Sequence, residues 1–338
     1  MSRVLLYAHD PGGALMLSAA AGAALSRGHQ LVFRAAGPSV ALWRNDGFDV
    51  VEDLTTSAPE FLNIDVVVTG TGFSTREQDM WMRAHAAGVP SLAVVDAWTS
   101  LARRFEAEDG HVQPDAVGVL DHELADELDG MTWWRGKTHV VGQPHLQIQT
   151  AELVGAREAL RTNSRVIVFF SEPVREDYGD TRGFDQFEVF EGLMAVYGQA
   201  ANSQIVVKPH PREDTAVWEH VVQGRAQLSS ASAADLLMAC DGVIGMTTMV
   251  LIEAHLLGLP VLSLQPERTG NVNPLVEDAT TPVLAWSAFP DAWQAYYALL
   301  GTEQTVSKRF SRLLKDADQR LVAAVEATVQ TNERELKC

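Results

Sequence analysis

The chain has 338 residues, with 26 Lys and Arg against 44 Asp and Glu, so its formal net charge is −18. Such an acidic protein repels the phosphates of nucleic acids and of anionic membranes, and we expect no partner of either kind. The composition, with 46% hydrophobic and 21% charged residues, is that of a globular protein, and the length favours two domains.

Cysteine content and hydropathy indicate the compartment. The two cysteines, Cys240 and Cys338, build neither a disulfide framework nor a zinc site, and Cys240 is expected to be a buried thiol in an apolar helix. No apolar run approaches the roughly 18 residues that span a bilayer, and residues 3–8 form a strand-length run without a cleavage site. We therefore expect a reduced, cytoplasmic protein with no transmembrane segment.

Short apolar strands alternate with helical stretches in the first half of the chain. The strand-like runs are residues 4–8, 30–34, 65–68, 91–95 and 115–120. Helical patterns cover 14–26 and 74–87, and the second opens with Ser74 and Glu77 at the spacing of a capping box. This alternation favours parallel βαβ units in a doubly wound sheet.

The rhythm breaks after a strand at 139–141, at a turn-forming stretch, and then resumes. A helical run at 151–160 precedes strands at 165–170, 204–208, 242–245 and 260–264, and residues 303–335 are polar and helical. We predict an α/β fold with two Rossmann-like domains that face each other across a cleft. The predicted boundaries are 1–145, 146–302 and a C-terminal helix in 303–338 that braces the lobes.

Ligands of open α/β sheets bind at the carboxyl ends of the strands, so we expect the catalytic and binding residues at these ends. The first strand ends in His9 and Asp10, either of which could be a general base. Gly12 and Gly13 follow and could let the backbone approach an acceptor, or could simply make a tight turn. The loop is not G-x-G-x-x-G, and no Walker pattern occurs, so no cofactor is expected.

Two further strand ends of the first half carry polar side chains. Thr71 lies in a Thr/Gly loop that could approach an acceptor or merely turn the corner. Asp96 ends an apolar strand and could act as a base, or orient His9 as the second member of a dyad; alternatively it caps a helix.

The strongest signal lies in the second half, where a buried strand runs into Lys208, His210 and Pro211. Prolines on both sides of the histidine fix the backbone, and a cation with an imidazole suits a phosphate leaving group. Ser171 and Glu172 end another strand. Ser171 could donate to a phosphate, and Glu172 could meet a sugar hydroxyl or be an ordinary loop residue.

A strand, a glycine, two threonines and a helix follow about 35 residues later. Gly245, Thr247 and Thr248 would place hydroxyls and free amides at the helix start, which suits an anion. Glu253, one to two turns further, could accept hydrogen bonds from a ribose diol. With the Lys208–His210 turn, this pattern predicts a pocket for a nucleotide phosphate.

These segments resemble glycosyltransferases of the two-lobed GT-B architecture. Lys208-Pro-His210-Pro looks like the HP motif of bacterial sialyltransferases and related capsule and lipopolysaccharide transferases. The resemblance implies that His210, Thr247 and Thr248 bind the donor phosphate. Glu108-Asp109-Gly110 matches the letters of the acidic pair and glycine that hold the base in those families, whereas other GT-B enzymes use a histidine soon after strand one, here His9.

The sequence therefore predicts a metal-independent glycosyltransferase, with inverting in-line attack preferred. The expected donor is a CMP-linked acidic sugar, or next a UDP-sugar, and the expected acceptor is a hydroxyl of a glycan, lipid-linked or protein substrate in bacterial surface glycan synthesis. Two alternatives stay open. Non-hydrolysing sugar-nucleotide 2-epimerases share the fold and a similar glycine-to-Glu helix, so an epimerase or hydrolase is possible on this pattern. A non-catalytic module that binds a sugar nucleotide is the other.

Overall fold

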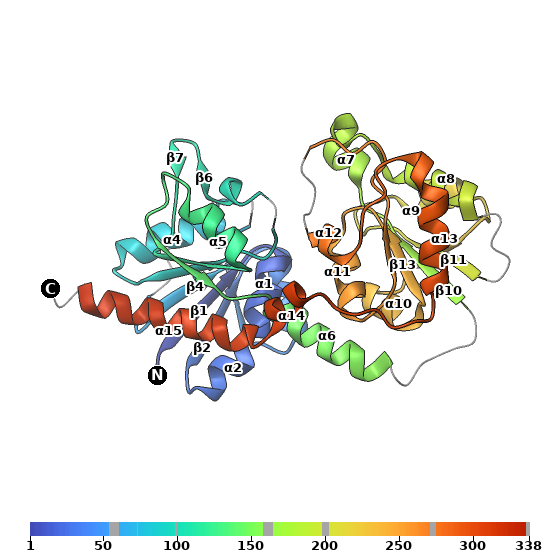
Figure 1. Cartoon of the computed structure of the whole chain (residues 1–338). Coiled ribbons are helices and arrows are strands. Elements are labelled where there is room, and N and C mark those ends of the chain that lie inside the picture. The colour runs from blue at the N-terminus through green and yellow to red at the C-terminus, as the bar shows by residue number, and fades with distance from the viewer. Residues whose placement is uncertain are drawn as a thin grey trace. The chain divides into compact units, whose positions relative to one another are not determined.

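The computed structural model describes residues 1–53, 61–72, 74–98, 100–157, 165–197, 203–270 and 275–335. These residues form two compact units (Figure 1). The first unit comprises residues 1–148 together with 312–338, and the second comprises residues 149–311. The chain thus returns to the first unit after completing the second.

The first unit is built on a seven-stranded sheet in which every neighbouring pair is parallel. Its order is β3-β2-β1-β4-β5-β8-β9, formed by β1 (Arg3–Ala8), β2 (Gln30–Ala35), β3 (Val50–Glu52), β4 (Val66–Thr69), β5 (Ser91–Val94), β8 (Ala116–Val119) and β9 (Lys137–Val140). Strand β3 was not expected from the sequence, because three residues give no periodicity. A small antiparallel hairpin, β6 (Glu106–Ala107) with β7 (Gly110–His111), is also additional.

Helices connect the parallel strands of the first unit. They are α1 (Pro11–Ala19), α2 (Ala21–Ser26), α3 (Pro38–Asn45), α4 (Arg76–Ala86), η1 (Ala102–Phe105) and α5 (His122–Asp129), with α15 (Ala317–Glu335) added from the end of the chain. α6 (Pro144–Arg157) leads from the first unit to the second, and α14 (Lys308–Leu314) leads back.

Three of the predicted helices differ in detail. The stretch 14–26 forms two helices that meet at Ala20, and 303–335 forms two helices of which the first begins at Lys308. The helix predicted over 151–160 begins earlier, at Pro144, and residues 158–160 lie outside the described part.

The predicted capping box of α4 is wrong. The N-cap residue is Thr75, which makes no side-chain cap bond, and the Ser74 hydroxyl donates to the Glu77 carboxylate at 3.0 Å. The physical reason is that Glu77 turns towards the loop after β1, where it accepts the His9 N–H.

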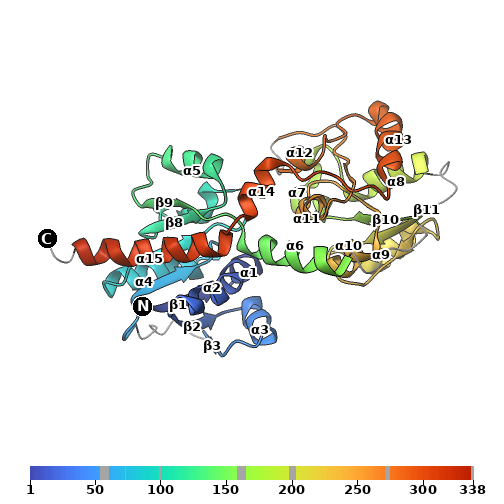
Figure 2. The same cartoon turned by 60° about the horizontal axis from the view of Figure 1, so that its bottom comes forward.

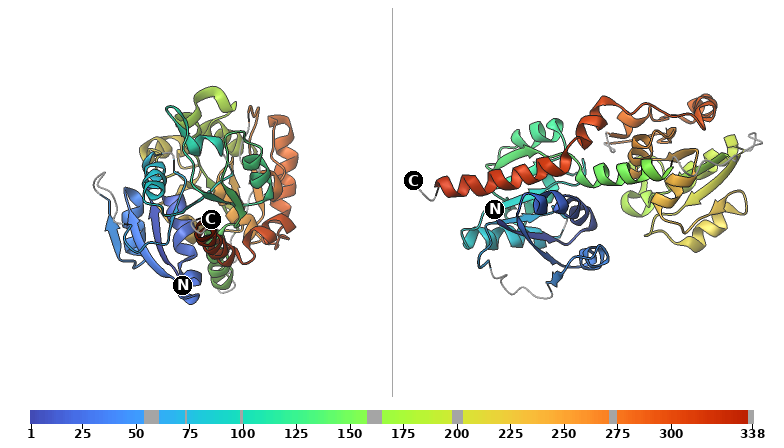
Figure 3. Two further views of the ribbon diagram at one scale, coloured as in Figure 1. Left: turned by 90° about the vertical axis from the view of Figure 1, so that its left-hand side faces the viewer. Right: turned by 90° about the horizontal axis from the view of Figure 1, so that it is seen from below.

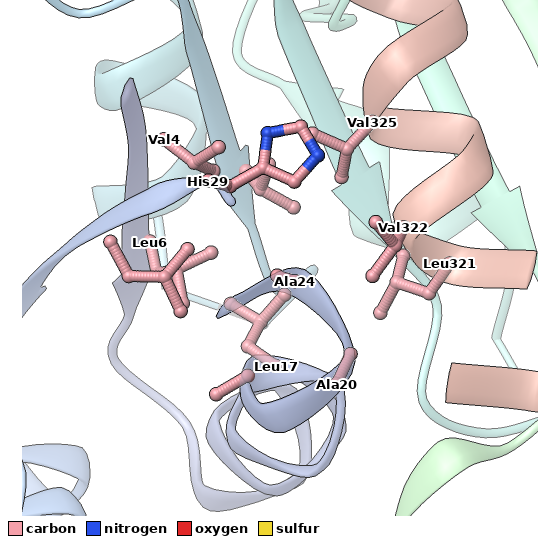
Figure 4. Close-up of a pocket in the computed structure, with 12 residues that line it drawn as sticks. Val4, Leu6, Leu17, Ala20, Ala24, His29, Leu321, Val322 and Val325 are labelled. Atoms are coloured by element: carbon pink, nitrogen blue, oxygen red, sulfur yellow. The ribbon is translucent and has the colours of Figure 1, made fainter. Parts of the chain in front are cut away.

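α15 packs along the first unit, where it contacts α2, β4, β5 and β8 (Figures 2 and 3). Its buried face presents Leu321, Val322 and Val325 to the small side chains Ala20 and Ala24 (Figure 4). The gap left between them holds about 20 Å³, which is room for little more than one water molecule. The helix therefore completes the apolar core of this unit.

The second unit is built on a five-stranded parallel sheet in the order β12-β11-β10-β13-β14. Its strands are β10 (Arg165–Phe170), β11 (Ser203–Lys208), β12 (Gln227–Leu228), β13 (Gly242–Gly245) and β14 (Val261–Ser263). Its helices are α7 (Val174–Tyr178), η2 (Gly179–Arg182), α8 (Gln186–Tyr197), α9 (Thr215–Val222), α10 (Ala233–Ala239), α11 (Met249–Leu256), α12 (Leu275–Ala279), η3 (Trp286–Ala288) and α13 (Phe289–Leu299).

Alternating side chains of β10 divide the core of the second unit between the two faces of the sheet. Phe169 packs with Phe190 of α8 and Trp218 of α9 on one face. Val168 and Phe170 belong to the cluster with α10 and α11 on the other face, which also contains the buried thiol of Cys240, as expected. Burial on both faces explains why these strands are continuous apolar runs.

Candidate functional site

Polar side chains gather at the carboxyl ends of the strands in each unit, and each group is described within its own unit. In the first unit, the loop after β1 places the ring Nδ1 of His9 2.7 Å from Asp10 Oδ1, with both side chains partly exposed. When Nδ1–H donates to Asp10, the ring Nε2 keeps a free lone pair and can accept a proton. Gly37, at φ +57°, lies against this ring, where an added Cβ would come within 2.7 Å of Nε2.

A buried glutamate supports this loop. The Glu77 carboxylate accepts the His9 backbone N–H at 2.9 Å, and burial raises the pKa of Glu77 above its usual range, with the Asp10 charge raising it further. Asp10 and Glu77 flank Gly72, since a Cβ there would lie 2.3 Å from Asp10 Oδ2 and 3.3 Å from Glu77 Oε1. The sequence indicated Glu77 only as a helix cap; its place in the first turn of a helix after β4 is the signal that could have revealed it.

Asp96 lies at the same edge of the sheet, but its partner is Arg104. Arg104 Nη1 donates to Asp96 Oδ1 at 2.6 Å and to both the carbonyl and the hydroxyl oxygen of Thr71, at 2.9 and 3.0 Å. Thr71 is buried, and its own hydroxyl donates to the Val94 carbonyl. The histidine that Asp96 would orient in a dyad is His9, and the partner of His9 is Asp10 instead.

The two glycines of the first loop lie against other parts of the sheet edge. A Cβ on Gly12 would come within 1.7 Å of Asp96 Oδ2, so Gly12 makes room for that carboxylate. A Cβ on Gly13 would come within 2.7 Å of Gly70 Cα, so here the backbone of α1 approaches that of the β4 end directly. Both glycines are thus accounted for by close packing inside the unit.

Glu108 and Asp109 form the turn of the β6–β7 hairpin. Both residues are exposed, and among the residues that the structure describes neither carboxylate forms an ion pair or a hydrogen bond. The structure therefore places this acidic pair in a surface turn.

In the second unit, Glu213 organises the turn after β11. Its carboxylate accepts the backbone N–H of His210 at 2.6 Å, the hydroxyl of Ser171 at 2.8 Å and the indole N–H of Trp218 at 3.1 Å. Burial raises the pKa of Glu213. The Ser171 hydroxyl, which we expected on a phosphate, thus donates inside the unit.

His210 presents a hydrogen-bond donor at this turn. Its Nδ1 accepts the backbone N–H of Arg212 at 3.1 Å, so the neutral ring carries its proton on Nε2. Burial, followed by the Arg212 charge, lowers the pKa of His210, which keeps the ring neutral at neutral pH. Pro211 is exposed in the same turn, and the partly exposed Lys208 ends the strand.

The loop between β13 and α11 has the predicted anion-binding form, but a carboxylate of the protein fills it. Glu172 accepts the Thr247 N–H at 2.5 Å and the Thr247 hydroxyl at 2.6 Å, and the amides of Met246 and Thr248 also donate to it. Thr248 is the N-cap of α11 and accepts the Val250 N–H at 3.3 Å. The sequence placed Glu172 near a sugar hydroxyl and did not predict this contact.

Two residues adjoining this loop have tightly packed or buried surroundings. A Cβ on Gly245 would lie 3.2 Å from the Thr248 methyl and 3.3 Å from the Phe170 carbonyl oxygen. Glu253 of α11 accepts a hydrogen bond from Gln149 Nε2 at 3.3 Å, and burial raises its pKa to about 7.

Neither metal clusters nor spanning helices are found in the described part of the chain. Residues 1–53, 61–72, 74–98, 100–157, 165–197, 203–270 and 275–335 contain no group of three or more His, Cys, Asp or Glu side chains that could hold a metal ion. Among the same residues, no helix has the length and hydropathy to cross a membrane.

Comparison with known proteins gives one family match and several structural likenesses. A family model described as "Protein of unknown function (DUF354)" matches residues 143–280, and no curated protein matches the chain. UDP-GlcNAc 2-epimerase from Methanocaldococcus jannaschii is 13% identical with a TM-score of 0.70, over 96% of this chain and 99% of that one. MnaA from S. aureus, in a co-structure with UDP, is 12% identical with a TM-score of 0.68, over 98% and 97%. MurG from Acinetobacter baumannii is 10% identical with a TM-score of 0.54, over 97% and 100%.

These likenesses concern the fold. They confirm the predicted α/β class with two Rossmann-like domains, the architecture of GT-B enzymes. None of the three proteins named above is a sialyltransferase, so the resemblance to that type stays a prediction.

Proposed function

We propose that the chain is an enzyme that acts on a nucleotide sugar and transfers the sugar to a hydroxyl acceptor. One observation carries the proposal: Lys208, His210 and the Thr247–Thr248 loop end strands at one edge of the second sheet, on either side of β10. An ammonium group, an imidazole N–H and the backbone amides of a helix start stabilise the charge that develops on a leaving phosphate.

We assign UDP as the preferred nucleotide, ahead of CMP. Two of the similar structures contain a uridine nucleotide: MnaA from S. aureus is in a co-structure with UDP, and UDP-GlcNAc 2-epimerase from Neisseria meningitidis is bound to UDP-GlcNAc. Glu253 is assigned to the ribose, because its carboxyl group is buried next to the helix start and can accept from a diol. The CMP-linked sugar expected from the HP resemblance becomes the second choice.

For the proton transfer we assign His9 as the general base and Asp10 as the residue that orients it. The acceptor O–H gives its proton to His9 Nε2 while the acceptor oxygen attacks the anomeric carbon in line, and the electron pair of the breaking C–O bond leaves with the nucleotide phosphate. Asp96 is assigned to the acceptor, with Arg104 holding its carboxylate and Thr71 holding Arg104. Gly12 and Gly13 support the acceptor side indirectly, because Gly12 leaves room for the Asp96 carboxylate and Gly13 lets α1 approach Gly70.

Nucleotide titration of a His210→Ala variant tests the proposal. We expect UDP to bind the wild-type chain with or without magnesium, and the variant to bind it at least about tenfold more weakly, because a phosphate hydrogen bond is lost. His220→Ala, an exposed histidine of α9, is the matched control and should leave the affinity unchanged. Equal UDP affinity of His210→Ala and wild type in calorimetry would remove His210 from the site. CMP, GDP, dTDP and ADP in the same titration rank the donor.

An epimerase or hydrolase of the same fold is the second candidate. The TM-scores to UDP-GlcNAc 2-epimerases are 0.66 to 0.70, and those to the glycotransferase of kitacinnamycin, the spinosyn rhamnosyltransferase SpnG and MurG are lower, 0.52 to 0.59. Incubating the chain with UDP-GlcNAc alone and following the sugar by NMR separates the two. Isomerisation or release of UDP without an acceptor supports the second candidate, and turnover only with an acceptor supports the transferase. Binding without any turnover leaves a non-catalytic module.

A further inference from the structure

The loop that the sequence marks for a donor phosphate is already occupied by an anion of the protein itself. We call the backbone N–H groups of Met246, Thr247 and Thr248, together with the Thr247 hydroxyl, the phosphate cradle. All four donors point to the carboxylate of Glu172, with the two bonds from Thr247 at 2.5 and 2.6 Å. A carboxylate held by several N–H and O–H donors has the same chemistry as a bound phosphate oxygen.

The sheet brings these two segments together. β10 and β13 are parallel neighbours, with Phe169 opposite Ile244, so the residues that follow each strand leave the sheet side by side. Pro173, at φ −77° and ψ 58°, then turns the backbone, and the Val174 N–H donates to the Glu172 carbonyl oxygen at 2.8 Å. Glu172 thus stands at the start of a tight turn, and its side chain extends from this turn to the cradle.

A second, separate observation shows that an external anion is still expected at this edge. On the other side of β10, Lys208 forms no ion pair with any residue that the structure describes, and the nearby His210 carries its free N–H on Nε2. Glu172 occupies the cradle, and neither the Lys208 ammonium group nor His210 Nε2 has a hydrogen-bond or ion-pair partner among the described residues. In a chain of net charge −18, such a cation marks a place for a negatively charged ligand.

We propose that Glu172 is an internal competitor for the phosphate cradle, and that the phosphate of a nucleotide or sugar phosphate binds by displacing its carboxylate. This inference rests on the proposed function, because it concerns the same site. The Glu172 residue is partly exposed, which leaves its side chain a route towards solvent, while burial of the carboxyl group in the cradle raises its pKa above the usual range. The affinity measured for a ligand is then reduced by the fraction of molecules in which the cradle is vacant.

Calorimetric titration of Glu172→Ala and Glu172→Gln tests the proposal, with inorganic diphosphate and UDP as probes. Removing the carboxylate vacates the cradle, so we expect Glu172→Ala to bind both probes at least about tenfold more tightly than the wild type. Glu172→Gln keeps the size but loses the charge, and we expect a smaller gain of the same sign. Glu188→Ala, in an exposed position of α8, is the matched control and should change neither affinity. Circular dichroism of each variant checks that it is folded.

Each outcome decides the inference. If folded Glu172→Ala binds diphosphate and UDP no more tightly than the wild type, or binds neither, Glu172 is not a competitor and the inference fails. If Glu172→Ala does not fold, Glu172→Gln decides by the same comparison. If the variant gains affinity for diphosphate but UDP binds no better than diphosphate, the inference stands and the nucleotide part of the proposed function fails. If wild type and variant bind UDP with equal affinity, the inference fails and the nucleotide part of the proposed function stands.

Discussion

Asp10 and His9 are adjacent in sequence, and the loop after β1 turns their side chains towards each other at 2.7 Å. Asp10→Asn keeps the shape but cannot hold the ring in the tautomer that leaves Nε2 unprotonated. We expect turnover of a UDP-sugar to fall by about 10²- to 10⁴-fold while the UDP affinity stays within twofold, because UDP binding is assigned to the second unit. The measurement is UDP release together with calorimetry.

Asp109→Asn, in the exposed hairpin turn, is the control for the same experiment. It should leave turnover unchanged. The reverse pattern, with a fully active Asp10→Asn and an inactive Asp109→Asn, would move the base to the Glu108–Asp109 pair.

Glu253 makes a prediction about stability and pH. Burial raises its pKa from 4.5 to about 7, so between these values the unfolded chain has lost the proton that the folded chain keeps. The free energy of unfolding is therefore highest, as far as this group is concerned, below pH 4.5. It falls by up to about 3 kcal/mol as the pH rises to about 7, because the folded state disfavours the charged carboxylate. We expect Glu253→Gln to be more stable than wild type at pH 8 and nearly equal to it at pH 4.5. Urea unfolding at the two pH values measures the difference, and an equal effect at both would contradict the assignment.

At the scale of elements, one glycine in α1 and one in α2 have opposite surroundings and provide a matched pair of substitutions. Gly13→Ala places a methyl group 2.7 Å from Gly70 Cα, where only backbone could give way, and we expect a loss of about 1–3 kcal/mol. Gly22→Ala, on the exposed side of α2 with no atom within 4 Å, should gain about 0.5–1 kcal/mol from helix propensity. Thermal unfolding of both variants measures the two effects, and a gain for Gly13→Ala would overturn the close approach of α1 to the β4 end.

The elements that the sequence revealed are the long apolar ones. β10 and β13 were predicted with the bounds they have, because burial on both faces leaves a run of apolar residues between polar turns. β3 and β12 were missed, since two or three residues at the sheet edges carry no pattern. The break at Ala20 was missed because Ala is compatible with a continuous helix, and only packing in the folded unit decides where the helix turns.

At the scale of the whole molecule, α15 links the end of the chain to its first unit. Leu321→Ala removes a buried side chain from the contact between α15 and the sheet, beside a gap that already exists, and we expect a loss of about 2–5 kcal/mol in the stability of the first unit. UDP binding, assigned to the second unit, should persist under native conditions. Urea unfolding and calorimetry measure the two quantities.

Gln330→Ala on the exposed face of the same helix is the control and should unfold within about 0.5 kcal/mol of wild type. Equal stabilities of Leu321→Ala and Gln330→Ala would show that α15 adds little to the first unit.

The sequence by itself determined the fold class, the succession along the chain of the strands that carry polar loops, and the residues at the carboxyl ends of those strands. It could do so because hydrophobic burial imposes a local period on strands and helices, and because parallel sheets collect loops at one edge. Tertiary structure alone decided which of those residues meet: Asp96 with Arg104 rather than with His9, Ser171 with Glu213, and Glu172 in the phosphate cradle. Such pairings depend on side-chain positions between segments up to 75 residues apart, and no local pattern encodes which acceptor a given donor will reach.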